Sequence, residues 1–216
     1  MNYFAHAMNF LDRPYFAAGT GVPDWLTVCD RGVRMRGRHL EAFCPGGDCR
    51  AAEVVDGILR HIRDDGLFHQ SRAFAELSLE LTIESRQALS DDSSFRPGFL
   101  GHLLVEVLLD ASLVAENPGK MEDYYRVLGS IDATVVQGAV NGVGRRRTER
   151  LATMISRFYQ ERILCDYLED GKLMARLNQI MSRVKLPRLP ESFIEVLPPA
   201  RELVENRRGE LLEGIL

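Results

Sequence analysis

Three ionisable side chains stand four residues apart in an otherwise apolar stretch, residues 99–114 (FLGHLLVEVLLDASLV). They are His102, Glu106 and Asp110. On a helix, this step places all three in one row along the same face. Because an apolar helix normally lies inside a domain, two carboxylates on it need a partner that offsets their desolvation. A divalent cation is a strong candidate for that partner.

A second row has the same step and consists of His61, Asp65 and His69. Gly66 weakens the predicted helix before His69 is reached. Two helices that face each other with such rows would offer six nitrogen and oxygen ligands. That ligand set suits a site for one or two ions in the core of a helical bundle.

His6 and Asp24, which lie near the N-terminal end of the sequence, complete the set of candidates. The candidate metal ligands are His6, Asp24, His61, Asp65, His69, His102, Glu106 and Asp110. Imidazoles and carboxylates without thiolates suit zinc, manganese or iron. The competing hypothesis is a buried ion-pair network in which Arg60, Arg63 and Arg72 neutralise the carboxylates. Buried networks of that kind stabilise a fold poorly.

The chemistry that this ligand set favours is hydrolysis. A cation with an open coordination position lowers the pKa of bound water towards neutrality and supplies hydroxide, and two ions about 4 Å apart would also hold both oxygens of a phosphodiester. A spare carboxylate, Asp65 or Asp110, could act as the base or as the acid for the leaving group. Arg145 and Arg146 follow a glycine-containing loop whose amides can approach an anion, which indicates phosphate binding; a merely solvated basic run is the alternative.

Composition restricts the class of protein. The chain has 216 residues and a formal net charge of −4, which gives no electrostatic reason to expect nucleic acid or an anionic membrane as partner. No run of about 20 apolar residues and no basic leader with an apolar run is evident, so we expect a cytoplasmic protein without a membrane partner. Cys44 and Cys49 could form a disulfide, hold a structural zinc or remain free thiols.

Apolar positions recur at helical spacing along most of the chain, and period-two alternation is scarce. We therefore predict an all-α fold, a single-domain helical bundle over residues 1–216 with a metal site between core helices. Residues 31–50 are basic and glycine-rich and predict an irregular, mobile excursion. Residues 186–216 predict a C-terminal helical extension. Glycines at 19 and 21 are expected to end one helical turn before a new element starts at Val22.

Three segments resemble the acyl-carrier-protein phosphodiesterases. Residues 1–6 (MNYFAH) resemble the family's opening, MNFLAH. Residues 57–65 match its GIxxHRxID segment at four positions, including His61 and Asp65, and residues 106–113 match its DVxxDHFL segment with Glu106 and Asp110 as the two acids. The resemblance implies an all-helical, manganese-dependent phosphodiesterase related to HD-type phosphohydrolases, which releases phosphopantetheine from a carrier protein.

A looser resemblance is to zinc-dependent phospholipase C, on the spacing His102-x-x-x-Glu106 and a Pro-Asp pair after an early histidine. The sequence as a whole therefore predicts a metal-dependent hydrolase of a phosphate ester, preferably a diester, with one or two zinc, manganese or iron ions. Its substrate would be a small molecule or a group linked to a carrier protein. The alternative is a non-enzymatic helical scaffold or interaction protein, for which a homodimer is one form. Its acids and histidines would then form a relic site, a structural metal site or a buried polar network.

Overall fold

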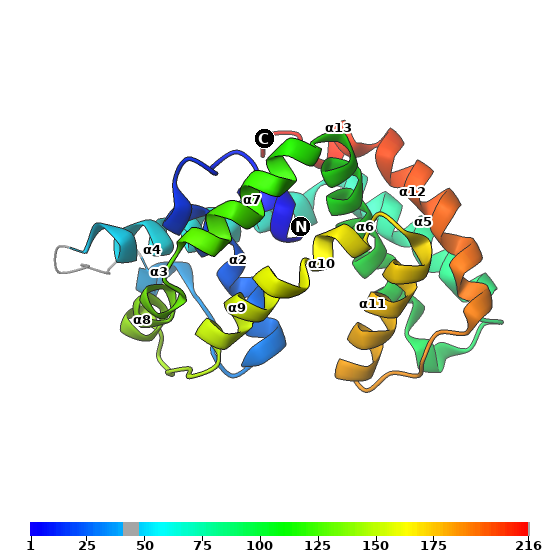
Figure 1. The fold of residues 1–216 in the computed structure, drawn as a ribbon. Helices are drawn as coiled ribbons and strands as arrows, with labels where there is room; N and C mark the ends of the chain where they lie inside the picture. The colour runs from blue at the N-terminus through cyan, green and yellow to red at the C-terminus, as the bar shows by residue number, and fades with distance from the viewer. Residues whose placement is uncertain (41–47, 216) are drawn as a thin grey trace. The chain divides into compact units, whose positions relative to one another are not determined.

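The computed structural model describes residues 1–40 and 48–215, and every regular element in that part of the chain is helical (Figure 1). The all-α prediction is therefore confirmed. Within the predicted domain the chain forms two compact units. The first unit contains Asn2–Gly66 and Asn117–Arg162. The second unit contains Met1, Leu67–Glu116 and Ile163–Leu216.

The helices of the first unit come from two stretches of sequence. They are α1 (Tyr3–Ala7), α2 (Pro14–Cys29), α3 (Gly37–Leu40), α7 (Pro118–Ser130), α8 (Ala133–Val143) and α9 (Leu151–Glu161). Helix α4 (Cys49–Gln70) belongs to this unit up to Gly66 and to the second unit from Leu67 onwards. The two ends of the predicted row on α4 therefore lie in different units.

The second unit contains the most apolar helix. Its elements are α5 (Arg72–Ala88), the 3-10 helix η1 (Ser93–Phe95), α6 (Pro97–Glu116), α10 (Ile163–Asp166), α11 (Asp170–Arg183), the 3-10 helix η2 (Glu191–Val196), α12 (Leu197–Asn206) and α13 (Arg208–Leu211). The predicted C-terminal helical extension is thus present as η2, α12 and α13. Helices α9 and α10 are separate because Arg162, which lies between them, adopts a left-handed conformation, φ 45°.

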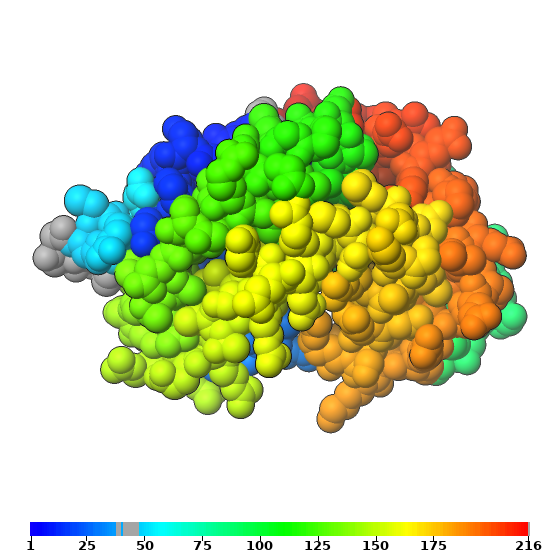
Figure 2. Space-filling view, viewed as in Figure 1, coloured from blue at the N-terminus to red at the C-terminus, as the bar shows by residue number. Residues whose placement is uncertain are grey.

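An aromatic cluster fixes the short helix α1. A five-residue helix is marginal by itself, so its position depends on packing. The Tyr3 ring lies 4.5 Å from that of Phe158 and 6.2 Å from that of Trp25, between ring centroids, and Phe4 meets Tyr124 edge-on. All these side chains are buried. They hold α1, and with it His6, against α2, α7 and α9; the last two helices lie side by side in Figure 2.

Helix α2 is continuous where the sequence predicted a break. It runs from Pro14 to Cys29, through Pro23 and through the glycines at 19 and 21. These glycines allow close packing instead of ending a helix. A Cβ on Gly19 would lie 2.3 Å from the Val54 carbonyl oxygen, and one on Gly57 would lie 2.2 Å from the Phe16 carbonyl oxygen. The backbones of α2 and α4 thus cross at a distance that excludes any side chain.

Helix α6 is the buried helix that the sequence predicted. The face of α6 that carries Gly101 packs closely against α5, since a Cβ on Gly101 would lie 2.4 Å from the Ser78 carbonyl oxygen. Among the described residues it is the one helix with the length and mean hydropathy, 1.7, that a membrane span requires. The sequence analysis had found no such run. In the structure, 61% of the most apolar 18-residue stretch of α6 is buried. Packing as a core helix accounts for its apolar sequence.

The predicted excursion at residues 31–50 is partly helical. It contains α3 and the first residues of α4, while residues 41–47 lie outside the described part of the chain. Cys44 is among those residues, so the alternatives for Cys44 and Cys49 remain open.

Two candidate metal centres

The predicted ligands gather into two groups, each within one unit. His6, His61 and Asp65 form the first, which we call the His6 centre. His69, His102 and Glu106 form the second, which we call the His69 centre. Within each group, one ligand atom from every residue lies within 4.8 Å of the others. Either group could hold a metal ion.

The grouping differs from the two facing rows that the sequence predicted. His69 joins the α6 ligands, whereas His61 and Asp65 join His6. The reason is helical geometry: eight residues of helix rise about 12 Å and turn about 80° beyond two full turns, so His61 and His69 cannot reach one small ion together. A row at four-residue spacing is too long for a single centre.

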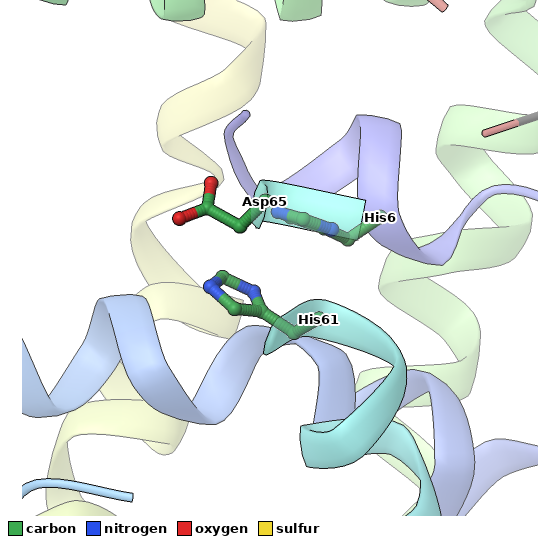
Figure 3. Close-up of side chains that lie close together, drawn as sticks. All are labelled: His6, His61 and Asp65. Carbon is green, nitrogen blue, oxygen red and sulfur yellow. The ribbon is translucent and has the colours of Figure 1, made fainter. Parts of the chain in front are cut away.

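The His6 centre is built from α1, α2 and α4. Figure 3 shows His6, His61 and Asp65 gathered together, with the His6 and His61 imidazoles face to face. Their ring centroids are 4.0 Å apart and their planes differ by 29°. Both histidines are buried, and Asp65 is half-buried. Asp24 on α2 belongs beside this centre, since its Oδ1 atom lies 4.0 Å from His61 Nε2.

The His61 ring is oriented by a backbone carbonyl. Its Nδ1 atom lies 2.8 Å from the Thr20 carbonyl oxygen and donates its hydrogen to it. The other ring nitrogen, Nε2, then carries a lone pair on the side where Asp24 lies. A ligating histidine commonly donates its second N–H to a carbonyl in this way, which fixes the ring and raises its basicity. The close crossing of α2 and α4 makes this contact possible.

Two of the three arginines of the ion-pair hypothesis pair with carboxylates outside the candidate set. Arg60 donates to Asp64 at 2.6 Å, and Arg72 donates to Glu76 at 2.6 Å. Burial raises the pKa of Asp64, and the Arg60 guanidinium opposes that rise. Asp64 and Asp65 are therefore distinct in role, since the first is paired with an arginine and the second faces two imidazoles.

The His69 centre has tighter contacts. His69 Nε2 lies 3.3 Å from His102 Nε2 and 3.1 Å from Glu106 Oε1, and His102 Nε2 lies 3.4 Å from the same oxygen. The Met1 amino nitrogen lies 3.3 Å from Glu106 Oε1. Burial by itself raises the pKa of Glu106, but hydrogen bonds from His102 and His69 and the positive amino group lower it to about 2. Glu106 is therefore ionised at neutral pH.

The remaining predicted residues lie outside both groups. Asp110 is fully buried one turn beyond Glu106 on α6. Arg145 and Arg146 are exposed after α8, in the first unit, and the Arg146 guanidinium lies against Gly32. Their predicted roles, general acid or base for Asp110 and phosphate binding for the arginines, stay predictions.

Sequence reasoning missed a pocket in the first unit. Its cavity of about 360 Å³ is lined by Pro23, Leu26, Thr27, Arg31, Val33, Arg34 and Met35. The lining therefore combines apolar side chains with two guanidinium groups, and three of its residues flank Asp24 in the sequence. The basic stretch after residue 30 was the available signal, but the sequence predicted an irregular, mobile excursion there.

Comparisons of the chain with protein-family models, with curated proteins and with solved structures found no match. The site geometry and the sequence resemblances are therefore the grounds on which a function is proposed.

Proposed function

We propose that the protein is a metal-dependent hydrolase of phosphate esters, preferably phosphodiesters, and that its catalytic cation is held at the His6 centre. The observation that carries the proposal is the convergence of the buried His6 imidazole of α1 with the His61 imidazole and the Asp65 carboxylate of α4. Asp24 on α2 lies 4.0 Å from His61 Nε2. Two nitrogen and two oxygen donors suit manganese, iron or zinc.

The proposed ligand set leaves room for reaction. Four protein ligands around a six-coordinate ion leave two positions, one for water and one for a phosphoryl oxygen. The ion would supply hydroxide and polarise the phosphoryl group. Asp65 is the most exposed of the three grouped ligands, and its second oxygen would accept the proton of the attacking water.

A phosphate ester is the favoured substrate class for two reasons. The segments around His6, His61 and Asp65 resemble those of the acyl-carrier-protein phosphodiesterases. In addition, the pocket beside Asp24 in sequence presents Arg31 and Arg34 together with apolar side chains. Guanidinium groups pair with phosphate oxygens, and apolar walls accept the organic group of an ester.

Metal analysis combined with turnover of bis-p-nitrophenyl phosphate tests this proposal. We expect manganese, iron or zinc to bind the chelator-treated protein and to restore turnover. Asp65→Asn should lower turnover much more than metal content, because the amide can still ligate but cannot accept a proton. Asp56→Asn, an exposed change on the same helix, is the matched control.

Two results would overturn the proposal. One is a protein that binds no ion at the His6 centre under any loading, which would favour the scaffold alternative. The other is a loaded protein in which Asp65→Asn and Asp56→Asn hydrolyse the ester at the same rate as the wild type.

A further inference from the structure

We propose that the His69 centre is a separate zinc site of tetrahedral geometry, which fastens the last turn of α4 to α6 within the second unit. The inference rests on atoms that the proposed catalytic centre does not use. It concerns the ligand distances, the residues that surround the imidazoles and the local charge.

The distances between ligand atoms match a tetrahedral ion. Zinc binds histidine nitrogen and carboxylate oxygen at about 2.0–2.1 Å, so two ligands of a tetrahedron lie about 3.3 Å apart. The three separations in the His69 centre are 3.1, 3.3 and 3.4 Å. Two histidines and a glutamate make a three-ligand set that leaves the fourth position to water or another donor.

Aromatic side chains hold both imidazoles in place. The Phe74 ring meets His69 edge-on, with centroids 4.7 Å apart, and meets His102 in the same manner at 4.9 Å. The two imidazoles are themselves stacked, with centroids 4.9 Å apart and planes 19° apart. Phe68 and Phe74 are both buried. These ring contacts restrict the orientation of both imidazoles.

The charge of the group also suits a divalent ion. Two neutral imidazoles and one ionised carboxylate would leave a bound zinc with a net charge of +1. The ion would compete for Glu106 Oε1 with the Met1 amino group, whose nitrogen lies 3.3 Å from that oxygen. The centre is accessible to an incoming ion, because the His102 side chain is 45% exposed and that of Glu106 is 19% exposed.

The structural consequence is local to the second unit. His69 is one residue before the end of α4, and His102 and Glu106 are one turn apart on α6. A zinc ion bound by all three would therefore cross-link two helices of this unit. Such a link stabilises the folded form, because the ligands are not assembled in the unfolded chain.

Zinc and cobalt titrations of the full-length apoprotein test the inference. The background is His61→Ala, which removes the best-oriented ligand of the His6 centre. We expect this variant to bind one equivalent of zinc, and one of Co²⁺ with the intense visible absorption of a tetrahedral ion. Adding His102→Ala should weaken zinc binding by more than about 100-fold and abolish that absorption.

Glu116→Gln is the matched control, because Glu116 is an exposed carboxylate on α6 that pairs with Arg208. It should leave zinc binding unchanged in the His61→Ala background. His102→Gln repeats the test with a polar replacement, and circular dichroism shows whether each variant keeps its helices.

The inference fails if the His61→Ala protein binds no zinc, if its Co²⁺ spectrum is the weak one of an octahedral ion, or if the His102 variants bind as tightly as the control. The first or last result would leave a hydrogen-bonded cluster around Glu106. None of these results depends on ester hydrolysis, so they are distinct from a failure of the proposed catalytic function.

Discussion

The His6 and His69 centres use the same side-chain types but differ in how their ligands are held. In the His6 centre the imidazoles are buried, and a main-chain carbonyl orients one of them at 2.8 Å. In the His69 centre the ligand atoms lie within 3.4 Å of one another, and an aromatic ring packs against both imidazoles. We propose that the first arrangement serves a reaction and that the second, whose ligand atoms lie closer together, serves as a cross-link. Similar ligand sets can thus suit reaction in one place and cross-linking in another.

The largest expected effect comes from removing the oriented imidazole of the His6 centre. His61→Ala should lower manganese- or zinc-dependent hydrolysis of bis-p-nitrophenyl phosphate by about 10³-fold, because a metal ion contributes several kcal/mol of transition-state stabilisation. Steady-state kinetics at saturating metal measure this loss. If His61→Ala retains wild-type turnover, the catalytic ion is not at this centre.

Removing the aromatic ring of the His69 centre should affect stability next most. Phe74→Ala should lower the free energy of unfolding by about 3–5 kcal/mol, because it leaves a cavity beside two imidazoles and Phe68. Zinc affinity in the His61→Ala background should fall about tenfold, since the rings lose their support. Urea unfolding and zinc titration measure the two effects. Ile83→Ala, an exposed change on the same helix, should cost less than about 0.5 kcal/mol.

The crossing of α2 and α4 distinguishes the two centres in another way. Gly57→Ala should destabilise the protein by about 1–3 kcal/mol, because its Cβ meets main-chain atoms that cannot move aside easily. It should also weaken metal binding at the His6 centre and leave the His69 centre unchanged. Gly66→Ala is the matched control on α4: it meets nothing within 4 Å and should stabilise by about 0.5–1 kcal/mol. Equal effects of both changes on unfolding would contradict the close crossing.

The smallest expected effect is a dependence of stability on pH away from both centres. Burial raises the pKa of Glu84 on α5, and the charge of Glu80 raises it further; its Oε2 atom is buried with no hydrogen-bond partner among the described residues. A raised folded-state pKa means that ionisation opposes folding above that pKa and has no effect well below it. Glu84→Gln should therefore stabilise the protein at pH 7 and lose its advantage under acid conditions. Thermal unfolding across pH measures this, with exposed Glu213→Gln as the control.

Sequence patterns predicted the helical class and singled out the six residues that form the two groups, because apolar periodicity and the cost of buried carboxylates are local properties. On α6 they singled out His102 and Glu106, which lie in the His69 centre, and Asp110, which lies outside it. They did not predict how the ligands are shared between centres, since that depends on which helix faces which. His69 follows Asp65 at the same step but lies in a group with residues of α6. The continuity of α2 was also missed, because glycines that allow a close crossing and glycines that end a helix are the same residue in a sequence.

The contact between Gly19, Gly57 and their opposite backbones has one more consequence. The separation of α2 from α4 at this point is set by van der Waals contact between main-chain atoms, with no rotatable side chain between them that could adjust. The position of the Thr20 carbonyl on α2 relative to the His61 ring on α4 is therefore fixed by this contact. Replacing other side chains of the first unit can change the stability of this helix pair. It should change the orientation of the His61 imidazole very little.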